Sequence, residues 1–172
     1  MNQRASNGPT IAFDEFGPLE IRPQAGRNWG SRANRHRATY TRKHGVRHWL
    51  AFYDLHDNRL WGYTRPRKRS REVLEVLKMM RRRYPAGQRI HLILDNFSPH
   101  RTPAVRQWCE RNNVHMIWTP TNASWLNPIE CQFTPVMEFV IRNSDYANHE
   151  ELADALRRYA HYRNQHAKRR KS

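Results

Sequence analysis

Cysteine, long apolar runs and recognisable metal-binding spacings are scarce in this chain of 172 residues. Its two cysteines, Cys109 and Cys131, form no CxxC or His–Cys pattern, which argues against a disulfide framework and a structural zinc site. No apolar stretch approaches the roughly 18 residues that a membrane span needs. The opening MNQRASNGPT also lacks the apolar segment of a signal peptide. We therefore expect a cytoplasmic protein that does not enter a membrane.

Acidic residues are also few, and positive charge is in large excess. Thirty-one lysines and arginines stand against fifteen acids, which gives a net charge of +16 and a pI near 11.0. Such a surface attracts nucleic acid, because neutralised phosphates release their condensed counterions; a merely solubilising surface is the alternative. With 38% hydrophobic residues and this length, the chain can bury the core of one domain.

The first third of the chain is expected to form three consecutive strands. Residues 11–21 combine apolar β-formers with a Gly-Pro break, which predicts a strand and a turn. Two aromatic-rich runs, 49–53 and 59–64, flank the turn residues DLHDN and predict a hairpin. Residues 1–10 are expected to be a flexible lead-in.

Helical and strand patterns alternate through the rest of the chain. SREVLEVLKMMRRRY has apolar residues at helical spacing, with Ser70 as the expected N-cap. RIHLILDN predicts a buried central strand, Thr102 caps the next helix, and VHMIWTP predicts another buried strand. A helix beginning at Asn127 should be kinked or interrupted by Pro135, and Asn148 caps the last helix.

The resulting order, β-β-β-α-β-α-β-α-α, predicts an α/β fold in which helices cover both faces of a mixed sheet. We expect the folded domain to span residues 11–166 and a basic tail to span 167–172. Sites in open α/β sheets form at the carboxyl ends of strands, which singles out Asp95 at the end of LILDN.

Two further acids, Asp14 and Glu130, also lie at or near the ends of predicted strands. Asp14 is in or at the end of the first strand, and Glu130 follows the last strand. Each acid has a structural alternative. Asp14 competes with the neighbouring Glu15, Asp95 can belong to a turn, and Glu130 can complete a capping box with Asn127. Three carboxylates within about 4–6 Å would repel one another unless cations such as Mg²⁺ or Mn²⁺ held them.

Three stretches resemble the signature blocks of DDE transposases: FDEFGPLEIRPQAGRNW, LILDNFSPH and TPTNASWLNPIE. The match is to the bacterial insertion-sequence branch of the mariner-like superfamily, in which the second and third acids keep a similar spacing to the 34 residues between Asp95 and Glu130. The resemblance implies a ribonuclease-H-like DDE catalytic domain. It assigns Asp14, Asp95 and Glu130 as the catalytic acids that bind two Mg²⁺ or Mn²⁺ ions.

The resemblance also implies a reaction, in which the ends of an insertion element are cut and the freed 3′-hydroxyl attacks target DNA, usually at a TA dinucleotide. The expected phosphate contacts come from RPRKRSR: Arg65, Arg67, Lys68 and Arg69. Trp125 is expected to stack on a splayed base, with core packing as the alternative. Asn96, His100 and Asn127 are expected to support the site, with a structural turn role open for Asn96 and His100.

Such transposases also carry an N-terminal helix-turn-helix region, whereas only ten residues precede Ile11. We therefore expect the catalytic portion alone, acting as a homodimer in the transposition complex and with a separate helix-turn-helix subunit. The alternative is a non-catalytic, basic DNA-binding remnant of a truncated or split transposase. The three retained acids favour the enzyme, and the missing recognition region favours the remnant.

Overall fold

The computed structural model describes residues 8–21, 45–121 and 123–167, and these form twelve elements. The strands are β1 (Thr10–Glu20), β2 (Val46–Asp54), β3 (Arg59–Arg65), β4 (Ile90–Leu94) and β5 (Val114–Trp118). The α-helices are α1 (Ser70–Arg81), α2 (Pro103–Arg111), α3 (Glu130–Val136) and α4 (His149–His166). Two 3₁₀ turns, η2 (Ser98–Arg101) and η3 (Ser124–Leu126), and a π-helix, η4 (Met137–Ile141), complete the set.

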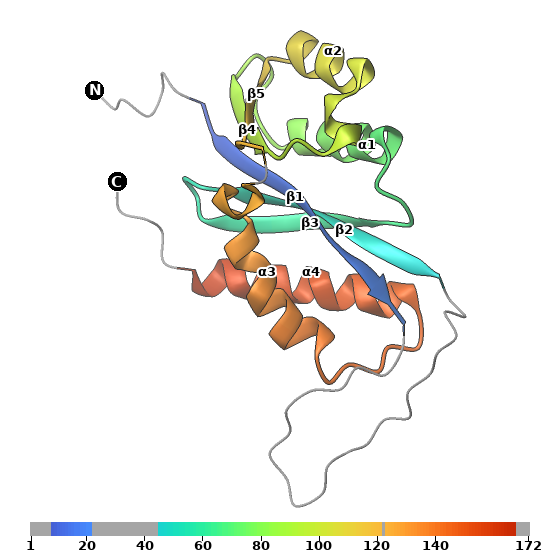
Figure 1. The fold of residues 1–172 in the computed structure, drawn as a ribbon. Coiled ribbons are helices and arrows are strands. Elements are labelled where there is room, and N and C mark those ends of the chain that lie inside the picture. Colours follow the sequence, from blue (N-terminus) through green and yellow to red (C-terminus); the bar gives the residue numbers. More distant parts are fainter. Residues whose placement is uncertain (1–7, 22–44, 122, 168–172) are drawn as a thin grey trace, which may run out of the picture.

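The strands form one mixed sheet in the order β3-β2-β1-β4-β5. β1, β2 and β3 are antiparallel neighbours, whereas β4 and β5 run parallel to β1. Helices α1 and α2 lie on one side of this sheet, and α3, η4 and α4 lie on the other (Figure 1). The predicted order of strands and helices is therefore confirmed, with short 3₁₀ turns added.

Alternate residues of the central strand β1 build the core on both sides of the sheet. Ile11 and Phe13 are buried with the apolar faces of α1 and α2, whereas Ala12 is buried with residues of α3, η4 and α4. This alternation follows from the two-residue period of a strand. It also means that Asp14 and Glu15, which continue β1, point to opposite sides of the sheet.

Two local expectations need correction. The N-cap of α1 is Arg69 and not Ser70, because the Arg69 backbone N–H donates to the Glu72 carboxylate at 3.1 Å. β5 is an edge strand and only half buried, with Ile117 39% exposed, because it has a neighbour on one side only. The expected interruption at Pro135 agrees with the structure, because the α-helical pattern of α3 ends at Val136 and is followed directly by the π-helix η4.

Parts of several expectations lie outside the described residues. They are residues 1–7 of the lead-in, residues 22–29 of the first signature block, residue 122 of the third signature block and residues 168–172 of the tail. None of the helices in the described part of the chain is both long enough and apolar enough to cross a membrane.

The two cysteines are expected to differ sharply in reactivity. Cys109 is a buried residue of α2, and burial raises the pKa of its thiol to about 12. Cys131, in contrast, is exposed. Because the thiolate is the reactive form, iodoacetamide should add to one cysteine in the native protein and to both in guanidinium. Intact-mass spectrometry measures this directly, and two adducts on the native protein would contradict the described packing of α2.

Candidate active site

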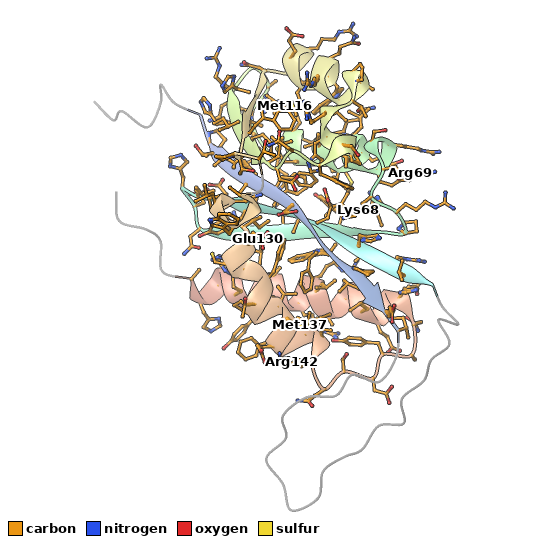
Figure 2. All side chains as sticks on the ribbon, viewed as in Figure 1. Lys68, Arg69, Met116, Glu130, Met137 and Arg142 are labelled. Carbon is orange, nitrogen blue, oxygen red and sulfur yellow. The ribbon has the colours of Figure 1, made fainter. Side chains whose placement is uncertain are left out.

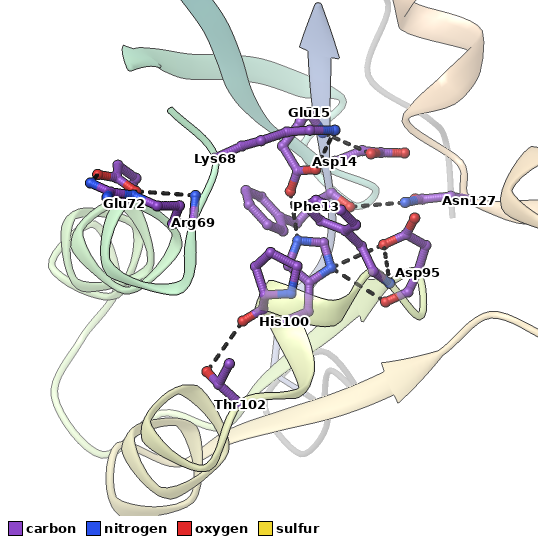
Figure 3. A network of polar contacts seen from close by, with 12 residues as sticks. Phe13, Asp14, Glu15, Lys68, Arg69, Glu72, Asp95, His100, Thr102 and Asn127 are labelled. Atoms are coloured by element: carbon purple, nitrogen blue, oxygen red, sulfur yellow. Dashed lines mark hydrogen bonds and ion pairs between the residues drawn. The ribbon is translucent and has the colours of Figure 1, made fainter. Parts of the chain in front are cut away.

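The parallel pairing of β1 with β4 brings the first two candidate acids together. Ala12 pairs with Ile93, so Asp14 and Asp95 each follow this pair by two residues. Asp14 is still within β1, whereas Asp95 comes directly after β4 ends at Leu94. The two carboxylates lie on the same side of the strand ends (Figure 3). This agrees with the rule that sites form beyond the carboxyl ends of parallel strands.

The third acid is brought to the same edge by Asn127. The buried Asn127 side chain donates through Nδ2 to the Phe13 carbonyl of β1 at 2.9 Å, and the Asn127 backbone carbonyl accepts the Glu130 N–H at 3.0 Å. Glu130 is the first residue of α3, and the N-cap is Ile129 (Figure 2). The alternative capping box of Asn127 and Glu130 is therefore wrong, because α3 begins only at Glu130 and Asn127 lies two residues before its N-cap.

Asn96 forms a second link between the elements of the site. Its Nδ2 donates to the Thr119 carbonyl at 2.7 Å, and the Thr119 N–H donates to the Leu94 carbonyl at 3.0 Å. These bonds tie the end of β4 to the segment that follows β5 and leads to α3. Asn96 therefore has the structural role that the sequence left open.

Asp14 is 9% exposed, and its environment disfavours its charge. Burial raises the pKa of Asp14 to about 7, and the charges of Glu15, Asp95 and Glu130 add to the rise. The Glu15 N–H opposes this by donating to Asp14 Oδ1 at 2.7 Å. Both other candidate acids thus lie close enough to Asp14 to repel its negative charge.

Oxygen donors with mutual repulsion suit a hard divalent cation such as Mg²⁺ or Mn²⁺. Within residues 8–21, 45–121 and 123–167, no three His, Cys, Asp or Glu side chains are placed closely enough to hold a metal ion together. The donor chemistry of Asp14, Asp95 and Glu130 therefore fits a metal, and binding it would require these three carboxylates to approach one another.

Asp95 is held by a fully buried histidine. His100 Nδ1 lies 3.0 Å from Asp95 Oδ1, and His100 Nε2 lies 2.6 Å from Glu15 Oε1 (Figure 3). Burial alone would lower the pKa of His100, but the hydrogen bonds to the two carboxylates and their charges raise it to about 9. The imidazole is therefore protonated at neutral pH and bridges the two acids.

The hydrogen bonds that Asp95 accepts determine its ionisation. Burial favours its neutral form, but the bonds from His100 and from the Phe97 N–H, 3.1 Å from Oδ1, together lower the pKa of Asp95. Asp95 is thus an ionised carboxylate whose orientation is fixed through one oxygen.

Sequence reasoning missed the part played by Glu15, whose side chain is buried against His100. Lys68 Nζ lies 3.8 Å from the other Glu15 oxygen and 4.4 Å from the centre of the Phe97 ring. The available signal was strand alternation: if Asp14 faces α3, its neighbour must face α1 and the Asp95 turn.

The remaining expected DNA contacts are placed as follows. Arg65 pairs with Glu75 at 3.3 Å, Arg69 pairs with Glu72 at 2.9 Å, and Lys68 pairs with Glu15 as described above. Three of the four basic candidates therefore lie in intramolecular ion pairs. Arg67 is exposed. Trp125 is 72% exposed in η3, so the core-packing alternative for this side chain is wrong.

Replacing Asn127 with Ala should destabilise the protein by about 1–3 kcal/mol, the usual cost of leaving a buried polar group without its partner. The Phe13 carbonyl loses its side-chain donor, and the start of α3 loses its attachment to β1. Urea denaturation measures the change. The exposed Gln107→Ala variant is the control and should stay within about 0.5 kcal/mol of the parent; equal stability of both variants would contradict the role given to Asn127.

Comparison with known proteins gives one family and one fold. Residues 9–153 match the family model described as "DDE superfamily endonuclease". The chain is 22% identical over 162 residues to the insertion element IS630 uncharacterized 39 kDa protein of Shigella sonnei, covering 92% of this chain and 46% of that protein.

Among solved structures, the chain is similar to the Mos1 transposase paired-end complex with the left transposon end. The TM-score is 0.65 at 13% identity, over 93% of this chain and 48% of the other. A pre-cleavage Mos1 transpososome matches with a TM-score of 0.66 at 14% identity, over 91% and 52%. This chain therefore spans about half the length of the relatives it matches. The likeness confirms the ribonuclease-H-like α/β fold.

Proposed function

Because this chain belongs to the DDE superfamily of endonucleases, we propose that it is the catalytic domain of a transposase that cuts DNA phosphodiester bonds with divalent metal ions. The observation that carries the proposal is that Asp14, Asp95 and Glu130 come from elements at one edge of the sheet, where the charges of Asp95 and Glu130 both act on Asp14. The β1–β4 register and the bond from Asn127 to Phe13 support this placement.

Asp14, Asp95 and Glu130 are the residues that would hold two ions, with Asp14 between the other two acids. Bound Mg²⁺ or Mn²⁺ would neutralise phosphate charge and lower the pKa of an attacking water. His100 and the Phe97 N–H hold Asp95 through Oδ1, so this carboxylate would be oriented with its other oxygen available to a metal. Such partners of metal-binding side chains fix their orientation.

DNA is the proposed substrate, as the ends of an insertion element and as a target such as a TA dinucleotide. The net charge of +16 supports a polyanionic partner. Arg67 and Trp125 are exposed, and Arg65 can exchange its partly exposed ion pair with Glu75 for a phosphate contact at little cost. Strand transfer, a homodimer and a separate helix-turn-helix subunit belong to the same proposal.

Incubating the purified chain with supercoiled plasmid in Mg²⁺, in Mn²⁺ and in EDTA tests this function. Nicking is expected with either metal and not in EDTA, and it should disappear in Asp95→Asn. DNA binding with no nicking in either metal would overturn the proposal for this chain and support the non-catalytic remnant. A salt titration of the binding should show the steep dependence that phosphate contacts produce.

A further inference from the structure

A groove on the α4 side of the molecule shares no residue with the candidate active site. It has a volume of about 810 Å³ and is formed by η4, α4 and the turn between β2 and β3. Met137 and Arg142 bracket the η4 wall (Figure 2). Aromatic and basic side chains dominate its lining: Phe139, Arg158, Tyr159, Tyr162, Arg163 and His166.

The aromatic rings of the groove are exposed to an unusual degree. Phe139 is 78% exposed and Tyr162 is 62% exposed. Phe139 stacks on Tyr159 with ring centres 6.2 Å apart, and Tyr162 packs on His166 at 4.1 Å. Tyr159 and Tyr162 are separated by about 4.5 Å of rise along α4. The groove therefore presents two ring pairs, about one helical turn apart, with surfaces open to a planar ligand.

The charge of the groove has one sign. Arg158, Arg163 and His166 line it, and none of the described lining residues is an Asp or a Glu. Arg163 is fixed in place, because its guanidinium lies over the Tyr53 ring at 5.2 Å and donates to Asn58. In the sequence, the four basic residues KRRK follow directly after Ala167, another lining residue.

These features select one class of occupant. A second copy of this chain would bring like charges together, because each copy carries +16 and this groove offers no carboxylate to either. A DNA duplex has its base faces stacked inside and would leave the rings unused. Exposed aromatic rings beside basic side chains are the combination by which proteins bind single strands without reading sequence. We propose that this groove binds a single-stranded segment of nucleic acid, with bases stacked on Phe139 and Tyr162 and phosphate contacted by Arg158.

The test is fluorescence anisotropy of a labelled oligothymidylate of about 12 nucleotides, within the 4–16 nucleotide range of such sites. EDTA is present throughout, so that binding is measured without metal-dependent nicking. Binding at the groove and nicking at the candidate active site can therefore each fail without the other. Phe139→Ala and Tyr162→Ala are each expected to weaken binding roughly tenfold, a typical loss for one stacked base. Both side chains are largely exposed, so the fold should tolerate these changes.

Arg158→Ala has a matched control in Arg157→Ala. Both changes remove one positive charge from α4, but Arg157 pairs with Asp154 and does not line the groove. Arg158→Ala should weaken binding and lower its salt dependence, whereas Arg157→Ala should change neither. The same comparison with oligouridylate separates RNA from DNA. If Arg158→Ala weakens the binding of both oligonucleotides equally, the groove accepts RNA as well as DNA. If it weakens only the binding of oligothymidylate, the groove is specific for DNA.

Photo-crosslinking of an oligonucleotide that contains 5-iodouracil locates the bound strand. Crosslinks in the peptides that contain Phe139 or Tyr162 are expected. Crosslinks found only near Trp125 or residues 65–71 would overturn the proposal. Unchanged oligonucleotide affinity in both Phe139→Ala and Tyr162→Ala would also overturn the proposal. This holds even if light scattering shows that the two variants change the oligomeric state of the protein.

Discussion

Asp14→Asn is expected to abolish metal-dependent nicking and to stabilise the metal-free protein. Asp14 is buried and repelled by Asp95 and Glu130, so an ionised carboxylate at this position opposes folding when no cation is bound. The asparagine keeps an oxygen that can accept the Glu15 N–H. We expect the free energy of unfolding in EDTA to rise by about 1–3 kcal/mol. This is the usual size of the effect of a single substitution that acts through one mechanism, here the removal of a buried charge.

The loss of nicking in Asp14→Asn should be at least about 100-fold, because removing even a partner of a metal ligand costs roughly 10–100-fold. Plasmid nicking and urea denaturation of the same preparation measure both effects. Asp145→Asn makes the same chemical change at an exposed acid and should alter neither. An Asp14→Asn variant that is less stable than the parent and still nicks DNA would contradict the account of this residue.

His100→Ala is expected to be the most destabilising substitution in the site. It removes a buried cation that bridges Glu15 and Asp95 and leaves the Glu15 carboxylate buried, with Lys68 Nζ 3.8 Å away as its remaining ion-pair partner among the described residues. Breaking a buried ion pair in this way costs about 3–5 kcal/mol, because the remaining charge is not compensated. Urea denaturation in EDTA measures the loss.

Two further variants separate the effect of His100 from general loss of packing. Lys68→Ala removes the half-exposed partner of Glu15 and should cost no more than about 1 kcal/mol. Glu15→Gln in the His100→Ala background should recover part of the lost stability, because no unpaired buried charge then remains. Additive losses in the double variant would show that the two side chains do not act as a pair.

The order of elements could be predicted from the sequence because it depends on local periodicity. The apolar spacing of residues 70–81 and the short run 90–94 each indicate their own structure without knowledge of the rest of the chain. The half-exposed β5 was predicted as buried, because an apolar run does not reveal whether its strand will lie at the edge of the sheet.

The candidate site could be predicted only in part, since its contacts join residues far apart in the chain. Asp95 follows from the rule for strand ends. The bond from His100 to Glu15 spans 85 positions and that from Asn127 to Phe13 spans 114, and no local pattern encodes either. The spacing of Asn127 and Glu130 also fits a capping box, but α3 begins at Glu130, and Asn127 instead donates a tertiary hydrogen bond to Phe13.

The basic run shows a similar limit. Its charge could be read directly, but its ion pairs with α1 could not, because they depend on how β3 and the start of α1 approach each other. Arg65 pairs with Glu75 and Arg69 with Glu72, which are carboxylates of the helix that the run precedes. DNA binding through these arginines must therefore replace the pairs, of which the partly exposed Arg65–Glu75 pair is the weaker one.

Mn²⁺ titration by calorimetry is the most direct test that Asp14, Asp95 and Glu130 form one metal centre. The measurement compares the parent chain with Asp14→Asn, Asp95→Asn, Glu130→Gln and the Asp145→Asn control. Saturable binding should weaken by at least about tenfold in each of the three site variants and remain unchanged in the control. Binding that is equally strong in all five proteins would show that the three acids do not hold the metal, and would contradict the proposed active site.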